Sequence, residues 1–358
     1  MEKSQRSKVN ELSPVNKLIA LGVALVVLGV GIWVIRSGAA GFLFAAEAEQ
    51  GAANGAVVLN DPTASAGKAL QFKAPVTPPP TPPPTTGQQS CPPFPAIPDE
   101  NCTGVPAGVA LTDIKGSLTT TSNGQVIDGK NIDGDLVVRH DNVTVVNTRI
   151  KGKISGANGS PVTNRGFVMR DTELGPDTCA SSGNGGIRQL QGGEFTLTRV
   201  HMHNHNDDMI SLLGGGKIVI EDSLLNRGCY YPEDHLDAIQ WYAPGDVANV
   251  TIKHSSIDSR PSNTSGYGNA PLFIADGMGK GSRFTITQNL FLGGTYSIRA
   301  HDVTADSFVD IDNNRVGRNQ YLYGPCALSA TTAFNGTGGV KFTNNAYSDG
   351  TPLPVSSC

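Results

Sequence analysis

The sequence of 358 residues has few aromatic side chains, few charges and no Cys-x-x-Cys motif. Aromatic residues make up 6% and charged residues 16% of the chain, and the formal net charge of −4 is spread thinly. Without a basic stripe, nucleic acid is excluded as an expected partner. Without Cys-x-x-Cys, the usual cysteine metal sites are not expected. Helix-forming runs are also absent beyond the N-terminus, whereas Gly (43) and Pro (23) are frequent, which favours a turn-rich β protein.

The longest uncharged apolar run is Leu18 to Ile35. As a helix it reaches about 27 Å, enough for a bilayer core. Basic residues precede it, so we expect residues 1–17 to be a cytoplasmic tail and residues 18–35 a transmembrane signal-anchor. Small residues at 39–40 and 45–46 leave a cleaved signal peptide as the alternative. The chain is then anchored at the cell surface, or secreted if the segment is cleaved.

All six cysteines follow this segment, and an even number in an exported chain predicts disulfides. Cys179 and Cys229 stand at nearly the same distance after their repeat units, which favours their pairing. The remaining pairs would be Cys326 with Cys358 and Cys91 with Cys102, although other pairings stay open at this stage.

One pattern, apolar-x-apolar-x-polar-x-x-apolar, recurs eight times. Its period-2 alternation predicts a strand, its polar fifth position a bend, and its last apolar residue a second short strand. A third short strand precedes most units. Because one coil of three strands cannot bury its own apolar stripe, coils are expected to stack into a β-solenoid, with the polar column as a ladder at the bend. A propeller is the competing repeat fold, but its blades need about 40 residues. The units begin at Val143, Phe167, Phe195, Ile218, Val250, Phe284, Val309 and Val340.

Three stretches, 102–149, 235–240 and 323–325, resemble secreted bacterial right-handed parallel β-helix proteins of the pectate-lyase-like superfamily. The resemblance implies an all-β, right-handed parallel β-helix over residues 99–358. It carries no single activity, because that superfamily includes lyases, hydrolases, esterases, epimerases and non-catalytic adhesins.

Residues 46–74 resemble the opening of a carbohydrate-binding module of family 6/35. We therefore expect a short module-like fragment over residues 36–75. A Pro/Thr-rich linker over residues 76–98 would follow it as an extended polyproline stalk, at about 3.1 Å per residue.

Acidic residues concentrate in the middle of the repeats. Asp208 and Asp237 take the same place in successive units, and stacked coils lie about 4.8 Å apart. Two carboxylates so close raise the pKa of one of them, unless a cation or an arginine neutralises them. The pair is therefore predicted either to share a proton or to bind Ca²⁺, the one cofactor we expect.

The order Asp207, Asp208, His235 and Arg299 is similar to that of the functional groups in polygalacturonase-type glycoside hydrolases. The resemblance implies that the acids activate water and protonate the leaving oxygen, while the arginine binds a sugar carboxylate. The family's Gly-His-Gly is absent and its Asn-Thr-Asp has no clear counterpart. We add Asp237 to these catalytic candidates as the partner of Asp208.

Four further residues are predicted to contact substrate: Arg188, Gln240, Trp241 and Tyr242. One outward column is expected to contain Arg188, Ser211, Gln240 and Arg299. This column also suits a lyase, because a lyase needs a base and a cation beside a uronate. Aromatic rings stack on the apolar faces of sugars. His201, His203 and His205 alternate, so a transition-metal site is a further reading, against the ordinary one of solvated side chains.

These observations predict a cell-surface polysaccharide-degrading enzyme, either lyase or glycoside hydrolase. Its expected partners are a polysaccharide or cell-surface glycan, and the membrane through the N-terminal helix; we expect a monomer. The alternative is a non-catalytic glycan-binding or adhesive surface protein.

Overall fold

The structure is a computed structural model, and it divides into two units, Met1–Pro83 and Pro84–Cys358. The division falls within the predicted linker, residues 76–98. The described residues are 56–60, 68–72, 90–156, 164–179, 186–188, 194–212, 215–232, 234–241, 247–274, 281–301, 303, 306–328 and 339–358.

The first unit contains one antiparallel pair of strands, β1 (Ala56–Asn60) and β2 (Lys68–Phe72). Both strands fall in the predicted module-like fragment, residues 36–75. The predicted tail and signal-anchor, residues 1–17 and 18–35, lie outside the described residues. In the part of the chain that is described, no helix is both long and apolar enough to cross a membrane.

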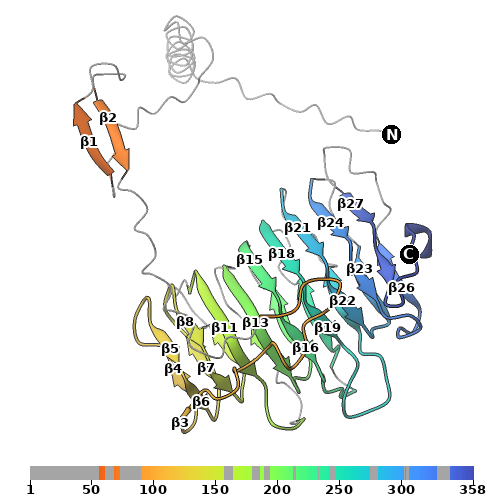
Figure 1. The fold of residues 1–358 in the computed structure, drawn as a ribbon, viewed down its shortest axis with the longest axis horizontal. Helices are drawn as coiled ribbons and strands as arrows, with labels where there is room; N and C mark the ends of the chain where they lie inside the picture. Colours follow the sequence, from red (N-terminus) through yellow and green to blue (C-terminus); the bar gives the residue numbers. More distant parts are fainter. Residues whose placement is uncertain are drawn as a thin grey trace, which may run out of the picture. The chain divides into compact units, whose positions relative to one another are not determined.

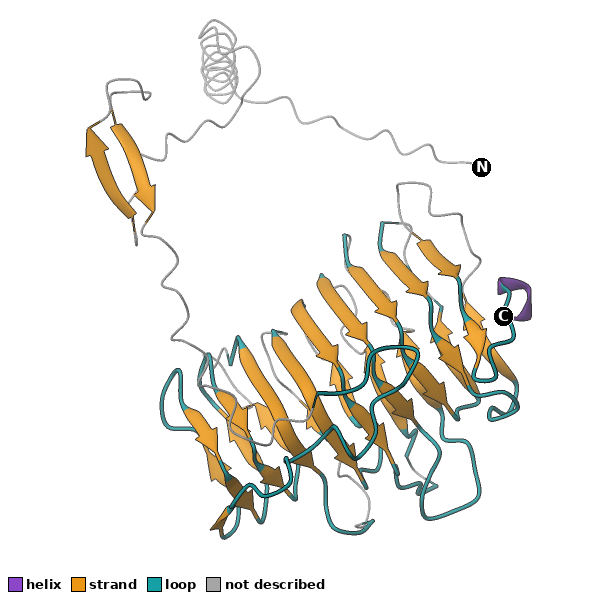
Figure 2. Cartoon of the chain, in the orientation of Figure 1, coloured by secondary structure: helices purple, strands orange, loops and turns teal. Residues whose placement is uncertain are grey.

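The second unit is all-β, and its strands stack in parallel ladders (Figures 1 and 2). Sheet 1 has nine strands: β4 (Leu118–Thr119), β7 (Leu136–Val138), β10 (Ile154–Gly156), β12 (Ile187–Arg188), β14 (Ile210–Leu212), β17 (Asp237–Trp241), β20 (Ala270–Ile274), β23 (Tyr296–Ala300) and β26 (Gly324–Leu328).

Two more ladders complete each coil. Sheet 2 contains β5 (Val126–Asp128), β8 (Thr144–Val146), β11 (Phe167–Leu174), β13 (Phe195–His203), β15 (Gly216–Glu221), β18 (Ala248–Lys253), β21 (Arg283–Thr287), β24 (Phe308–Asp312) and β27 (Gly339–Thr343). Sheet 3 contains β3 (Thr112–Ile114), β6 (Lys130–Ile132), β9 (Arg149–Ile150), β16 (Leu224–Asn226), β19 (Ser256–Asp258), β22 (Leu290–Leu292), β25 (Arg315–Val316) and β28 (Ala346–Tyr347). The long strands β11 and β13 run through the corner and pair in both ladders. The 3-10 helix η3 (Val355–Ser357) follows the last coil.

The repeat predicted from the sequence is the register of these ladders. The third position of the eight units forms one buried column, Val145, Met169, Leu197, Ile220, Ile252, Ile286, Ile311 and Phe342. Apolar columns on both sides of the corner therefore form one continuous core, and the β-solenoid prediction is confirmed.

The polar fifth position of every unit is a left-handed bend. Asn147, Asp171, Arg199, Asp222, His254, Gln288, Asn313 and Asn344 have φ between 47° and 60°. Five of the eight are Asn or Asp, the non-glycine residues that tolerate this conformation best. The bend turns the chain from sheet 2 into sheet 3.

The fifth-position side chains pair across part of this column, Arg199 with Asp171 and His254 with Asp222. The buried Asn ladder lies one residue further along the chain, at Asn289, Asn314 and Asn345. Ser255 N donates to Asn289 Oδ1 at 3.0 Å, Asn289 N to Asn314 Oδ1 at 3.0 Å, and Asn314 N to Asn345 Oδ1 at 2.9 Å. The ladder gives buried backbone amides partners from coil to coil.

Residues 90–105 form no coil but run along the outside of this corner, and we call them the strap (Figure 1). Gly104 N donates to Arg199 O at 3.0 Å, and the ring of His254 contacts Ala96 O through Nε2 at 3.0 Å. The first strand of the solenoid is β3, which begins at Thr112.

All three predicted disulfides are present: Cys91–Cys102, Cys179–Cys229 and Cys326–Cys358. The first closes the strap, and the second joins the loops that follow β11 and β16. Three disulfides indicate an oxidising environment such as the cell exterior.

Candidate functional site

Asp208 and Asp237 occupy the same position on adjacent coils of sheet 1. Ile210 pairs with Ile239 in the parallel ladder, and each aspartate stands two residues before its isoleucine. Both are buried: Asp208 is 6% exposed and Asp237 is 0% exposed. The predicted alignment of these two carboxyls is therefore present in the fold.

The Asp208 carboxylate is held by two neighbours on the outer face of sheet 1. Ser211 Oγ donates to Oδ2 at 3.0 Å. The Gln240 amide, turned so that its nitrogen faces the carboxylate, donates to Oδ1 at 3.1 Å and Oδ2 at 2.6 Å. Both oxygens of Asp208 therefore act as acceptors.

The Asp237 carboxyl lies deeper, and its pKa is raised well above the ordinary value. The first cause is burial, and the second is the nearby charge of Asp208. The side-chain amide of Asn269, at 2.9 and 3.0 Å from the two oxygens, and the positive charge of Arg299 oppose this rise. Burial and the charge of Asp208 thus favour the protonated form of Asp237.

Arg299 connects the acidic pair to the next coils. Its guanidinium donates to Asn269 Oδ1 at 3.3 Å and lies 4.3 Å from the centre of the Phe273 ring. It also contacts His301 Nε2 at 3.1 Å, and since a guanidinium only donates, this imidazole nitrogen accepts.

The predicted outward column exists, and it contains one residue that was not predicted, Phe273. Ser211 pairs with Gln240, Gln240 with Phe273, and Phe273 with Arg299. The backbone of Arg188 lies in the same row, because Ile187 pairs with Ile210. The side chain of Arg188 lies outside the described part of the structure, as does all of Tyr242.

Three other predicted residues have different surroundings from this pair. Asp207 occupies a left-handed bend (φ 59°) and is partly exposed. His235 is exposed, and within the described residues it has no hydrogen bond to Asp208 or Asp237. Trp241 is fully buried and packs edge-on against Phe284 at 5.4 Å between ring centres. We correct its predicted role, because a fully enclosed ring has no face on which a sugar can stack.

The sequence did not single out Asn269, Phe273 or His301. Phe273 and His301 could have been found from the register, because both continue the outward positions of Gln240 and Arg299. Asn269 could not, since it precedes its strand and reaches Asp237 only through the loop between coils.

The three histidines of the 201–205 segment have separate partners. His201 Nε2 contacts Asn226 Oδ1 at 3.0 Å, His203 Nε2 contacts Glu173 Oε1 at 2.8 Å, and His205 Nε2 contacts Leu174 O at 3.2 Å. His203 and His205 are buried rather than solvated. No group of three His, Cys, Asp or Glu side chains suited to a metal ion occurs among the residues that are described.

Comparison with known proteins adds no relative. No family model matches. Searches of curated proteins and of solved structures also find no match. The superfamily resemblance therefore rests on the sequence stretches given above and on the parallel solenoid itself.

Proposed function

We propose that this chain is a polysaccharide-degrading enzyme that acts on the outer face of sheet 1. The observation that carries the proposal is the buried Asp208–Asp237 pair, aligned on adjacent coils with Arg299 in the neighbouring row. Strongly perturbed carboxyls beside a cation are characteristic of acid–base sites.

The two aspartates are assigned different roles. Asp208 is the carboxyl with some exposure, and its oxygens accept from Ser211 and Gln240, so we assign to it the exchange of a proton with substrate. Asp237 is enclosed, and it acts as a positioning residue that holds the shared proton. Asp207 precedes Asp208 in the sequence, and the exposed His235 stands two residues before Asp237; both remain proposed catalytic groups.

Arg299 supplies positive charge near the enclosed Asp237. A guanidinium suits the carboxylate of a uronate, so an acidic polysaccharide is the favoured substrate class. Both routes stay open: a hydrolase adds water across the glycosidic bond, whereas a lyase removes a proton next to the uronate carboxylate. Gln240, and Arg188 from the same row, would contact the sugar, and Tyr242 remains a proposed contact.

Ca²⁺ bound by Asp208 and Asp237 fits less well than a shared proton. The oxygens of both carboxyls already accept from N–H or O–H donors, of Gln240 and Ser211 for Asp208 and of Asn269 for Asp237. A calcium ion needs six to eight free oxygen ligands. Activity should therefore persist when Ca²⁺ is chelated.

The wider setting follows from the sequence resemblance. We propose that the coil is right-handed, as in the pectate-lyase-like superfamily and in nearly all parallel crossovers. We also propose that residues 18–35 anchor the protein at the cell surface, with the polyproline linker as a stalk. The disulfides support an exported location.

The test is product release by the full chain from a panel of acidic and neutral polysaccharides, with and without a chelator. A lyase product absorbs in the ultraviolet through its new double bond, and a hydrolase product shows only new reducing ends. A polysaccharide that is bound but never shortened would instead establish the alternative, a non-catalytic glycan-binding or adhesive protein.

A further inference from the structure

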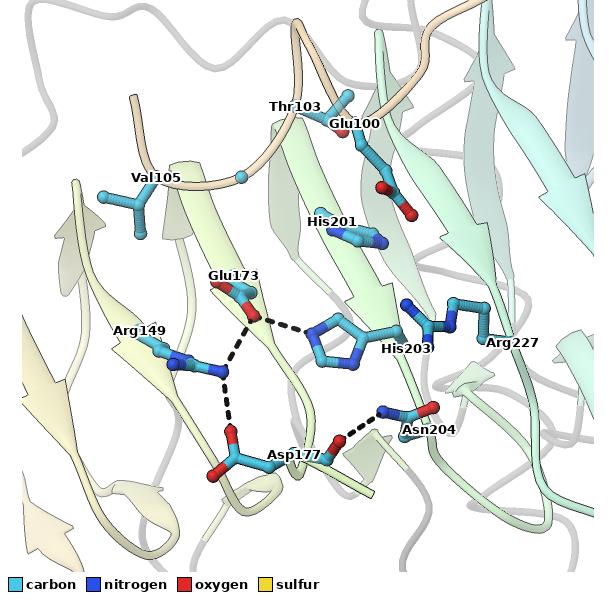
Figure 3. A pocket seen from close by; sticks show the side chains of 11 residues that line it. Glu100, Thr103, Val105, Arg149, Glu173, Asp177, His201, His203, Asn204 and Arg227 are labelled. Atoms are coloured by element: carbon cyan, nitrogen blue, oxygen red, sulfur yellow. Dashed lines mark hydrogen bonds and ion pairs between the residues drawn. The ribbon is translucent and has the colours of Figure 1, made fainter. Parts of the chain in front are cut away.

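A pocket that shares no residue with the acidic pair lies between the strap and the outer face of sheet 3 (Figure 3). Its volume is about 340 Å³, and its lining includes Glu100 from the strap and Arg149, Glu173, His201, His203 and Arg227 from the coils. The volume is at the low end of small-ligand pockets, which are about 300–1,000 Å³. It has room for one small ring rather than for a polymer segment.

The floor of this pocket is a fixed network. Glu173 accepts from His203 Nε2 at 2.8 Å and lies 3.3 Å from Arg149, which also pairs with Asp177 at 2.7 Å. The hydrogen bond from His203 and the charge of Arg149 lower the pKa of Glu173, although burial opposes them. These charges satisfy one another, so the floor is rigid and attracts neither an anion nor a cation strongly.

The walls carry two charged side chains that the floor does not use. Figure 3 shows the Glu100 carboxylate on one side of the His201 ring and the Arg227 guanidinium on the other. Neither forms a hydrogen bond or ion pair with the other side chains that the structure describes, and both residues are exposed. They leave one strong acceptor and one strong donor facing the same small space.

His201 lies between them and adds a second acceptor. Its Nε2 faces Asn226 Oδ1, which accepts, so Nε2 carries the hydrogen and Nδ1 keeps its lone pair. Burial, followed by the charge of His203, lowers the pKa of His201, which keeps the ring neutral near pH 7. In addition, His203 Nδ1 is buried and has no hydrogen-bond partner among the described groups.

The strap closes the pocket by an unusually close approach. Gly104 has φ 81°, and a Cβ at this position would lie 3.3 Å from Cβ of His201. Glycine is therefore suited to this position, and the Cys91–Cys102 disulfide fixes the turn that carries Glu100. The pocket exists only because the strap is docked on the coils.

We propose that this pocket binds a single neutral sugar residue. Vicinal hydroxyls both donate and accept, so one ring can donate to Glu100 and His201 while it accepts from Arg227. An anion would meet the carboxylates of Glu100, Glu173 and Asp177, and a cation would meet the two arginines. The proposal is independent of catalysis on sheet 1, because the two sites share no residue.

The experiment measures binding, by calorimetry or ligand-observed NMR, of a panel of single sugars to the full chain. The panel contains neutral hexoses, a hexuronate, an amino sugar and inorganic phosphate. We expect saturable binding of at least one neutral hexose. Glu100→Gln and Arg227→Gln should each weaken it by about tenfold or more, since each removes a charge-assisted hydrogen bond.

Matched controls are Glu194→Gln and Arg165→Gln, which change exposed side chains outside the pocket and should leave the affinity unchanged. All four variants should keep the wild-type circular dichroism spectrum. The proposal is overturned if no neutral sugar binds, if the hexuronate, amino sugar or phosphate binds more tightly, or if both pocket variants bind like wild type. Failure of polysaccharide cleavage has no bearing on these outcomes, so the two proposals fail separately.

Discussion

Asn269 donates its side-chain amide to both carboxyl oxygens of Asp237, at 2.9 and 3.0 Å. Its own oxygen accepts from Arg299 at 3.3 Å, so one asparagine connects the arginine to the enclosed acid. These contacts favour the ionised form of Asp237, yet its pKa is raised, because burial and the charge of Asp208 outweigh them. The surroundings of Asp237 thus act in opposite directions on its pKa, and the net effect is a rise.

Asp237→Asn should leave the protein at least as stable as wild type near pH 7. The folded-state pKa of Asp237 lies above the unfolded value, so the folded chain binds more protons in that window. Wild-type stability therefore falls as pH rises from about 4 through the folded-state pKa. The variant has no such group, so the difference in free energy of unfolding between the variant and wild type should grow with pH. Urea unfolding from pH 4 to 8 measures this.

Asp208→Asn is the informative companion for that experiment. It removes the second cause of the raised pKa of Asp237, so the fall in stability with pH should become smaller but persist. Equal pH slopes in wild type, Asp208→Asn and Asp237→Asn would show that the two carboxyls do not interact.

Asn314→Ala should destabilise the solenoid by about 2–4 kcal/mol, because it leaves buried backbone groups without partners. Asn289 N and Ile286 O both lose their hydrogen bonds to this side chain. Asn313→Gly is the matched control at the adjacent bend, where glycine adopts the left-handed φ of 56° without strain. Chemical denaturation should show a large loss for the first variant and a change below about 1 kcal/mol for the second. Similar losses in both would contradict the assignment of the ladder to the residue after the bend.

His254→Ala should loosen the strap. Its ring contacts Ala96 O at 3.0 Å and Asp222 Oδ1 at 2.5 Å, so it joins the strap to the corner. Hydrogen exchange at the amides of Cys102 and Gly104 should become at least about tenfold faster, because local opening needs less free energy. His235→Ala, which removes an exposed ring, should leave these amides unchanged. Unchanged exchange in the first variant would show that the strap is held by other contacts.

The sequence was sufficient for the architecture because the solenoid is built from local rules. The alternation in each unit determines which side chains point inward, and the fifth-position residues all adopt the left-handed bend. Stacking then follows, since Leu197 pairs with Met169 on one side and Ile220 on the other. The same periodicity aligned Asp208 with Asp237.

What the periodicity does not encode is contact between parts far apart in the chain. Glu100 meets His201 because the strap crosses the corner, and no repeat predicts that crossing. Asn269 reaches Asp237 from a loop. Trp241 was misjudged because it was taken as an aromatic ring beside the acidic segment, whereas its own place in the strand faces the core. Inward or outward orientation was the better guide there than residue type.

The most direct test of the account is product release by the full chain carrying Asp208→Asn, Asp237→Asn or both changes. On a polysaccharide that wild type degrades, each single change should lower the rate by about 100-fold or more, as for loss of a general acid or base. The double change should lower it little further, because the carboxyls act as one unit. Asp310→Asn, which alters a pair with Lys341 on a distant coil, should keep the wild-type rate. Full activity in Asp208→Asn would contradict the account, as would a wild-type chain that releases no product from any polysaccharide offered.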